Sequence, residues 1–362
     1  MTDLLETKPV PPPSEVPQGV NVPLWRTRLR LMLESLGDSW RLFARHKIGL
    51  VGLGIIGFFA LLAVLQPILL ATVWDPAIYD PIQGNDVVVH ELTVVEQVTD
   101  PSTQIDLLSA RLITPFAKVG ETVNQTLAPA PPDSRHWLGT DTNGRDVLSQ
   151  LMYGTRAAFM LGAIAALVTV IIATIVGSMA AYFGGLTDGV LMRLADLLLL
   201  VPLIPILIVV GASFTITMPM LGLILGLLNG FGGTAIILKS QALAVKVKPF
   251  IDSARVSGGG HFHIIFRHII PNVLPLSFLY MMFSVTEAVS LEATLSFLGL
   301  LNINMSWGIM IFGANAGGYL LGQSMRWWLL FPAGLAVSFL AAAFFLVGRA
   351  MDEVVNPRLR RR

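Results

Sequence analysis

Long apolar runs without a single charged residue are the feature that most constrains this chain. Five runs lack Asp, Glu, Lys and Arg: Ile48 to Trp74, Ala157 to Thr187, Leu197 to Leu238, Ile269 to Thr286 and Trp327 to Gly348. About 20 apolar helical residues cross the hydrocarbon core of a bilayer. The third run has 42 residues, too many for one crossing, and Thr215 to Pro219 offers a turn within it. We therefore predict an all-α membrane protein with six transmembrane helices.

Composition agrees with a bilayer environment. Hydrophobic residues make up 54% of the 362 and charged residues only 13%, whereas a soluble domain is roughly a quarter charged. The formal net charge of +1 gives no indication of nucleic-acid binding. The chain has no cysteine, which excludes disulfides, thiolate metal sites and cysteine nucleophiles.

Basic residues flank the two ends of the apolar region and predict its orientation. They are Arg26, Arg28, Arg30, Arg41, Arg45 and Lys47 before the first run, and Arg349, Arg358, Arg360, Arg361 and Arg362 after the last. Positive charge favours the cytoplasmic side, so both termini are expected there. This requires an even number of spans. The charge-free segment Ala293 to Met325 is therefore predicted to be non-spanning outer structure, in part re-entrant.

The same reasoning divides the chain into successive parts. Residues 1–23 are proline-rich and predict a disordered cytoplasmic tail. Residues 24–47 predict an amphipathic interfacial helix, with a plain basic flank as the alternative. The first span is predicted at 48–74. Residues 75–156 are predicted to form an extracytoplasmic segment that ends in a motif leading into the second span. A core domain at 157–350, with the remaining spans, and a basic tail at 351–362 follow. The first part of the outer segment, "DVVVHELTVVEQV" included, alternates weakly and predicts a small β-containing module.

The loop 239–272 is expected on the cytoplasmic side and is too long for a simple turn. Pro249 suits the first turn of a short helix, Asp252 complements the dipole at its start, and Gly258 to Gly260 end it. A second apolar stripe of helical spacing, from Phe262 to Ile269, follows. We predict two short helices joined by a glycine elbow, with Pro271 opening the next membrane helix.

This pattern resembles the coupling loop, or EAA motif, of ABC-importer permeases. Asp252, Ser253 and Ala254 match its opening triplet, Gly258 its glycine, and Ile269, Ile270 and Pro271 its ending. The resemblance implies docking into a cleft of a cytoplasmic ATPase. The candidate ATPase-coupling residues are Asp252, Ser253, Ala254, Arg255, Gly258, Gly259, His261, Ile269 and Pro271. Three glycines in place of one leave open how rigidly the elbow is held.

The three histidines of this loop raise the alternative of a metal site, because close imidazoles can ligate zinc. His261 and His263 are two residues apart and diverge on a helix, and no Cys, Asp or Glu nearby completes a ligand set. We therefore predict no metal site.

A second motif, before the second span, reads "HWLGTDTNGRDVLSQLMYGTR". It resembles the signature of the dipeptide, oligopeptide and nickel branch of these permeases, with Gln150 where arginine is usual. The residues that carry it predict a structural lock for the start of the span: His136, Gly139, Thr140, Asp141, Gly144, Arg145 and Asp146. In "GGLTDGVLMRLADLLLLVP", which fits the same branch, Arg193 and Asp196 are spaced to pair as a structural clamp.

Two acidic residues follow the fifth charge-free run. Glu292 opens "EATLSFLGL", which also resembles this branch, and Glu287 is expected deeper in the membrane. An ionisable group in a membrane helix usually faces a pathway or a partner. Glu287 and Glu292 are therefore candidate pathway residues, with pairing to an arginine of another subunit as the alternative.

Together the resemblances imply a type I ABC-importer permease fold with an enlarged outer segment between the first two helices. They identify a non-enzymatic, C-type permease subunit in a bacterial or archaeal cytoplasmic membrane, forming half of the path for peptides or similar solutes. The implied partners are a homologous permease, two ATPases and an extracytoplasmic binding protein. The chain has no G-x-x-x-x-G-K-[ST] loop, so ATP and Mg²⁺ are expected on the ATPase and no cofactor on this chain.

Two other function classes stay in view. An ion-coupled secondary transporter would use Glu287 and Glu292 and would need no ATPase dock. An intramembrane hydrolase would need a nucleophile with a base inside the membrane, and no such grouping of serine, histidine and acid occurs in the predicted spans. The sequence does not choose among dipeptides, oligopeptides, nickel chelates, glutathione and oligosaccharides as solutes.

Overall fold

The computed structural model describes residues 40–86, 88–100, 103–301, 303–320 and 325–355. The chain divides into two compact units, residues 1–45 and 46–362, each described by itself. In the first unit, Trp40 to Phe43 form a helical turn, and the Trp40 and Phe43 rings stack with centroids 5.9 Å apart. The predicted tail 1–23, most of the predicted helix 24–47 and residues 356–362 lie outside the described residues.

The second unit is mostly helical. Four of its described helices are long and apolar enough to cross a membrane: α2 (Lys47–Thr72), α5 (Val147–Phe183), the continuous helix His261–Phe297 and α14 (Trp327–Val355). Two bent pairs meet the same test, α6 (Gly185–Leu200) with α7 (Leu203–Ser213) at 77°, and α8 (Met218–Phe231) with α9 (Gly233–Lys246) at 44°. The described chain therefore has four membrane-capable helices, or up to six if each bent pair is one span.

The observed helices extend beyond the charge-free runs. Helix α5 begins at Val147, ten residues before the predicted span, and includes Arg156. It ends at Phe183 and is followed by Gly184 and Gly185, whose φ angles of +68° and +50° suit glycine. Helix α6 then begins at Gly185 rather than Leu197 and contains Asp188, Arg193 and Asp196. Helices therefore extend past the charge-free runs, because they continue through charges that lie near their ends or find partners.

Helix α5 packs against α2, α6, α8, α9 and α12. Its closest approach to α8 uses three glycines spaced by four, Gly222, Gly226 and Gly230. A Cβ added at Gly226 would lie 2.6 Å from the Val168 Cβ and 2.8 Å from the Ala165 carbonyl oxygen. Small residues at this spacing bring helix backbones together, which is how helices pack in membranes, where burial from water is not the driving force.

Helix α13 (Trp307–Ala316) has 10 residues, so it is about 15 Å long, half the ~30 Å hydrocarbon core. It packs against α12 and α14, and the Trp307 indole donates to the Leu151 carbonyl at 2.9 Å. The part of the charge-free segment after α12 therefore contains a helix too short to cross a bilayer, in line with the non-spanning structure predicted there.

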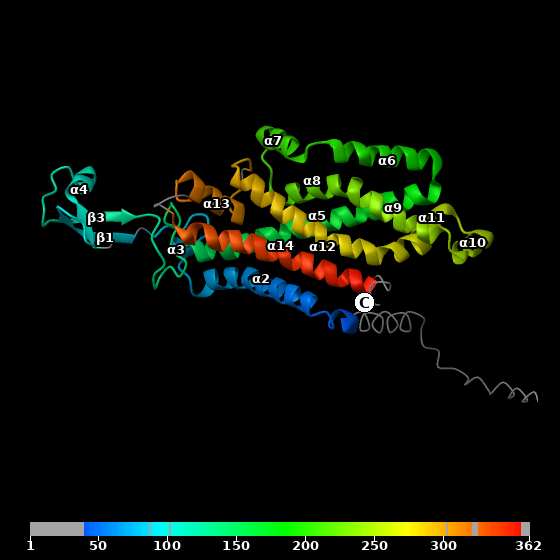
Figure 1. Cartoon of the computed structure of the whole chain (residues 1–362), viewed down its shortest axis with the longest axis horizontal. Coiled ribbons are helices and arrows are strands. Elements are labelled where there is room, and N and C mark those ends of the chain that lie inside the picture. The colour runs from blue at the N-terminus through cyan, green and yellow to red at the C-terminus, as the bar shows by residue number, and fades with distance from the viewer. Residues whose placement is uncertain (1–39, 87, 101–102, 302, 321–324, 356–362) are drawn as a thin grey trace, which may run out of the picture. The chain divides into compact units, whose positions relative to one another are not determined.

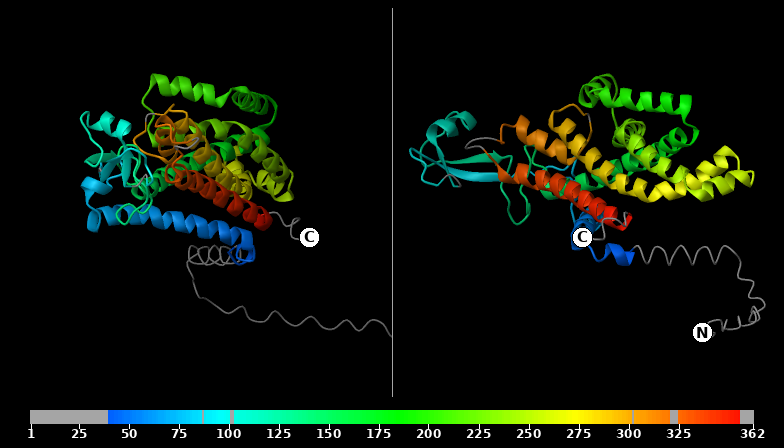
Figure 2. Two further views of the ribbon diagram at one scale, coloured as in Figure 1. Left: turned by 60° about the vertical axis from the view of Figure 1, so that its left-hand side comes forward. Right: turned by 45° about the vertical axis from the view of Figure 1, so that its right-hand side comes forward.

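A small sheet lies between α2 and α5 in the chain, in agreement with the weak alternation of the sequence. Strand β1 (Val88–Val95) pairs in parallel with β2 (Gln104–Asp106) and antiparallel with β3 (Thr122–Leu127), and α4 (Leu107–Ile113) packs on it. The sheet and α13 lie toward one end of the long helices, and α10 (Pro249–Val256) lies at the other (Figure 1). Figure 2 shows the same separation from two further directions.

Candidate functional site

The glycine elbow between α10 and α11 (His261–Ile264) has a defined backbone geometry. The Gly258 amide donates to the Arg255 carbonyl at 3.1 Å, and the Gly259 amide donates to the Ala254 carbonyl at 3.0 Å. These two bonds form a Schellman motif, in which the first residue past the helix cap adopts left-handed φ. Gly258 occupies that position with φ +82°. The elbow therefore ends α10 sharply and in one conformation.

The three glycines are not equivalent. Gly258 is required by its positive φ, although a Cβ there would meet nothing within 4 Å. Gly259 is required by space, because a Cβ would lie 2.7 Å from the Ala254 carbonyl oxygen. Gly260 has φ −68° and ψ 161°, an ordinary extended conformation, with open space around it. Two of the three glycines thus hold the elbow, and only Gly260 is free of constraint.

One side of the loop is anchored in the helix bundle. Ile251, Ile264, Ile265 and Ile269 are fully buried against the ends of α5 and α9. Helix α10 presents its other side to solvent, where the Asp252 and Arg255 side chains are 67% and 51% exposed and pair at 3.1 Å. Exposed apolar side chains lie close by in the chain: Val247, Val256 and Phe262. The loop therefore projects a mixed charged and apolar surface from a fixed base.

His261 and Tyr182 connect the loop to the end of α5. The Tyr182 hydroxyl and the His261 Nδ1 are 2.9 Å apart, and the Phe183 ring lies 5.8 Å from the His261 ring. His263 instead lies beside His268, with ring centroids 5.6 Å apart. The two nearby histidines therefore point to different partners, as their spacing predicts.

The loop continues into the membrane-capable helix without a break. Helix α11 passes through a π-helical turn, η1 (Ile265–Ile269), into α12 (Ile270–Phe297). In that turn the Ile270 amide donates to the Ile265 carbonyl, five residues back. Pro271 has no backbone amide to donate to the carbonyl four residues back. Single π turns inside α-helices are rare and are frequent at functional sites. Pro271 lies in the first turn of α12, as predicted for the opening of the membrane helix, and α11, η1 and α12 together run without a break from His261 to Phe297.

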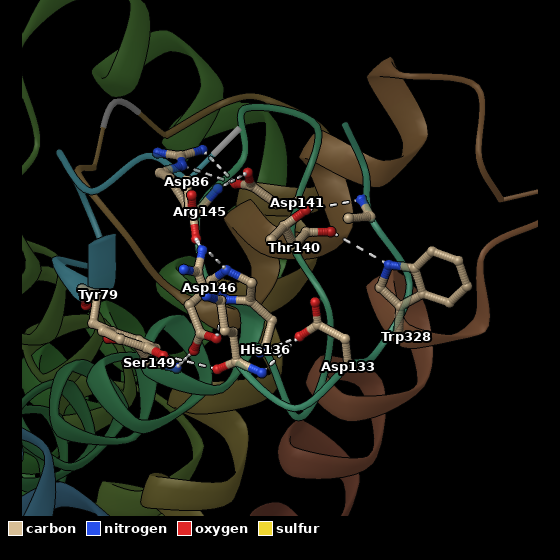
Figure 3. A network of polar contacts seen from close by, with 12 residues as sticks. Tyr79, Asp86, Asp133, His136, Thr140, Asp141, Arg145, Asp146, Ser149 and Trp328 are labelled. Carbon is tan, nitrogen blue, oxygen red and sulfur yellow. Dashed lines mark hydrogen bonds and ion pairs between the residues drawn. The ribbon is translucent and has the colours of Figure 1, made fainter. Parts of the chain in front are cut away.

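A polar network holds the opposite end of α5 (Figure 3). His136 is fully buried, with Nδ1 2.9 Å from an Asp146 oxygen and Nε2 3.2 Å from an Asp86 oxygen. Carboxylates at both ring nitrogens favour the doubly protonated ring. The hydrogen bond to Asp146, followed by that to Asp86, raises the pKa of His136 against the opposite effect of burial. Asp146 also caps α5 through the Ser149 amide at 2.6 Å.

The other motif residues complete this network. Asp141 accepts from the Arg145 guanidinium and from the Gln150 side-chain amide, each at 2.8 Å. The Thr140 carbonyl accepts from the Trp328 indole at 3.3 Å, which ties the motif to α14. Gly139 and Gly144 have φ +71° and +77° and stand against backbone or side chains that exclude a Cβ. Within this region the side chains interact with one another and with backbone, as in a structural lock.

Helix α6 differs from expectation at its charged residues. Arg193 and Asp196 are both exposed and form no ion pair with each other in the described part of the chain. The pairing prediction is wrong because exposure leaves little to hold such a pair together. Asp188, on the side toward α9, instead forms an ion pair with Lys239.

Glu287 and Glu292 lie on different faces of α12. Glu292 is 3% exposed and accepts from the Ser296 hydroxyl at 2.7 Å, so it faces the protein interior. Glu287 lies on the exposed face and accepts from the Asn229 amide of α8 at 3.1 Å. Of these two residues, Glu287 is exposed and Glu292 is buried.

Sequence reasoning missed several of these contacts. Tyr182 is 79 positions before His261, and Lys239 is 51 after Asp188, so local spacing gives no signal for either pair. Lys246, whose ammonium group donates to the Ala181 carbonyl at 2.9 Å, was also missed. The sequence signal for this contact is that Lys246 lies in the last turn of α9, because cations are favoured near the free carbonyls at the C-terminal ends of helices.

Comparison with known proteins gives two family matches and several relatives. Residues 173–361 match the model of the binding-protein-dependent transport system inner membrane component, and residues 35–86 match the N-terminal TM domain of oligopeptide transport permease C. A dipeptide transport system permease protein of Bacillus subtilis is 30% identical over 92% of this chain and 88% of its own length. An oligopeptide transport system permease protein of the same organism is 33% identical over 66% and 77%. A probable D,D-dipeptide transport system permease protein of Escherichia coli is 29% identical over 63% and 75%.

Proposed function

Because the chain belongs to the family of inner membrane components of binding-protein-dependent transport systems, it is a permease subunit of an ATP-driven importer, and we propose that its solutes are peptides. The subunit is multi-pass and non-catalytic, as its family and its apolar helices indicate. The relatives named for dipeptide, oligopeptide and D,D-dipeptide transport support the solute class. The same relatives do not favour an ion-coupled secondary transporter.

The proposal assigns residues 249–271 as the contact with the ATPase. The supporting observation is the two-sided loop, in which four of the five isoleucines are fully buried while Asp252, Arg255 and Val256 face solvent at the end of the helix bundle. A rigid base with an exposed helix is what a mechanical contact requires. The loop then faces the cytoplasm, and with six spans both termini face it too. A homologous permease, a second ATPase and an extracytoplasmic binding protein complete the proposed assembly, and ATP and Mg²⁺ bind to the ATPases.

Charge reversal on the exposed side of α10 tests this assignment. The Asp252–Arg255 pair is exposed and contributes little to folding, so Asp252→Lys should leave the subunit in the membrane at the wild-type level. We expect co-purification of the ATPase and peptide uptake to fall together, because the substitution places a new charge in the docking surface. Glu91→Lys is the matched control, since Glu91 is exposed on β1 at the other end of the long helices.

Two outcomes would contradict the assignment. One is wild-type ATPase binding and uptake in Asp252→Lys. The other is equal loss of ATPase in Asp252→Lys and Glu91→Lys, which would show that charge reversal acts on the subunit as a whole.

A further inference from the structure

Helix α12 carries a polar stripe on its exposed face. Glu287, Ser290 and Thr294 are spaced by three and four residues and are all exposed, while Ala288, Val289 and Ala293 are buried against the bundle. Residues at this spacing share one face of a helix. The half-buried Asn229 of α8 lies beside the stripe, with its amide on the Glu287 carboxylate. We call these four residues, Asn229, Glu287, Ser290 and Thr294, the α12 stripe.

The exposed faces of other long helices are different. On α14 the exposed residues at helical spacing are Phe331, Leu335 and Phe339, which are 47 to 51% exposed. Apolar faces of this kind suit contact with lipid. An ionisable residue in a membrane helix is costly against lipid and usually faces the bundle interior, a water-filled path or a partner. The α12 stripe therefore marks a face that does not contact lipid.

The hydrogen-bonding groups that the stripe leaves free are mainly acceptors. The Ser290 hydroxyl donates to the Thr286 carbonyl and the Thr294 hydroxyl to the Ser290 carbonyl, each at 2.8 Å. The Asn229 amide donates to Glu287 at 3.1 Å. Because both hydroxyl donors and one of the two Asn229 N–H donors are already used, what remains is mainly acceptors: hydroxyl oxygens, an amide oxygen and a carboxylate. Within the described residues no cationic side chain forms an ion pair with Glu287.

The depth of the stripe also suits a path for solute. At 1.5 Å per residue, Glu287 lies about 24 Å along the helix from Pro271, in the part of α12 distant from the coupling loop. A surface that offers mainly acceptors and a carboxylate at that depth is complementary to a group with several donors and a positive charge. An ammonium group has three donors and no acceptor.

We propose that the α12 stripe lines the solute path and that Glu287 receives the N-terminal ammonium group of the peptide. This inference rests on the proposed function, since it takes peptides as the solutes. Asn229 positions the carboxylate, and Ser290 and Thr294 supply further acceptors along the same face.

The absence of cysteine from the chain allows a direct test of the path. In the assembled transporter, Ser290→Cys gives this subunit a unique thiol on the stripe, and Phe339→Cys gives one on the apolar face of α14. A membrane-impermeant methanethiosulfonate reacts with thiolate in water. We expect the thiol of Ser290→Cys to be labelled and that of Phe339→Cys to remain unlabelled under the same conditions. No labelling of Ser290→Cys would mean that lipid or a companion subunit covers the stripe, and the proposal would fall.

The ammonium contact is tested by protection of the same thiol. Dialanine should slow labelling of Ser290→Cys, and N-acetyl-dialanine, which has no ammonium group, should not. Adding Glu287→Gln should raise the half-protecting dialanine concentration about tenfold, because a charge-assisted hydrogen bond is lost, and Glu287→Asp should restore most of the protection. Equal protection by the two peptides would overturn the ammonium assignment. ATPase co-purification is measured in parallel, so that failure of the coupling assignment is seen separately.

Discussion

Replacing the three elbow glycines one at a time with alanine gives an ordered set of effects that the structure dictates. Gly258 has φ +82°, where an L-residue is strained, and the cost of left-handed backbone is about 1–2 kcal/mol. Gly259 has a normal φ but no room, with a Cβ 2.7 Å from the Ala254 carbonyl oxygen. Gly260 has both a permitted conformation and open space. Alanine there costs nothing in the folded state and restricts the unfolded chain.

The magnitude follows from these local terms. A cost of 1–2 kcal/mol corresponds to about a 5- to 30-fold rise in the open population of the elbow. The amides of residues 258 and 259 donate the two bonds that close the elbow, so their hydrogen exchange measures opening directly. For Gly258→Ala we expect the exchange rate of these amides to rise about 5- to 30-fold. For Gly259→Ala we expect a rise because the added Cβ displaces the Ala254 carbonyl, and for Gly260→Ala we expect no rise.

The assay is hydrogen–deuterium exchange of the peptide covering residues 250–262, combined with peptide uptake per ATP hydrolysed. A looser elbow should lower coupling in the same order as it raises exchange. Wild-type exchange in Gly258→Ala, or equal effects of all three substitutions, would refute the view that two of the glycines hold the elbow.

Two further predictions concern other parts of the chain. The raised pKa of His136 means that its contribution to stability is complete below about pH 6.5 and is lost as pH rises through the higher folded-state pKa. As pH rises above about 6.5, the unfolding temperature of the wild type should therefore fall by more than the unfolding temperature of His136→Asn. Parallel plots of unfolding temperature against pH for the two proteins would contradict this prediction. Gly226→Leu should lower the unfolding temperature by overpacking α5 against α8, at a cost of about 1–3 kcal/mol or more. Gly57→Leu is the control, because a Cβ at Gly57 would meet nothing within 4 Å, and it should leave the unfolding temperature unchanged. An equal fall in unfolding temperature for both variants would count against close packing at Gly226.

The sequence predicts what depends on local composition. Apolar runs predict the membrane-capable helices, and weak alternation predicts the sheet, because hydropathy and period are properties of neighbouring residues. Helix ends are predicted less well, since Arg156 and Asp188 lie inside helices that the charge-free criterion cut short. Asp188 is stabilised by Lys239, a residue far along the chain.

In the candidate site, too, the sequence predicts the local features, and the packing of distant segments decides the rest. The need for glycine at an elbow is visible in the sequence, but which glycines are needed depends on φ at Gly258 and on the Ala254 carbonyl beside Gly259. The different faces of Glu287 and Glu292 are likewise set by helix packing. At five residues apart the two side chains point away from each other on α12, and only the position of the bundle decides which one is buried.

Continuity of one helix connects the proposed coupling contact with the proposed solute contact. The helix from His261 to Phe297 has no loop between the elbow and Glu287, and Ile265 and Ile269 fix its π turn against α5 and α9. Close-packed interiors transmit displacement rather than absorb it. A displacement of α10 relative to the bundle must therefore either bend the elbow or move this helix. Because two glycines and two backbone hydrogen bonds hold the elbow in one conformation, movement of the helix is the favoured response, and the α12 stripe moves with it.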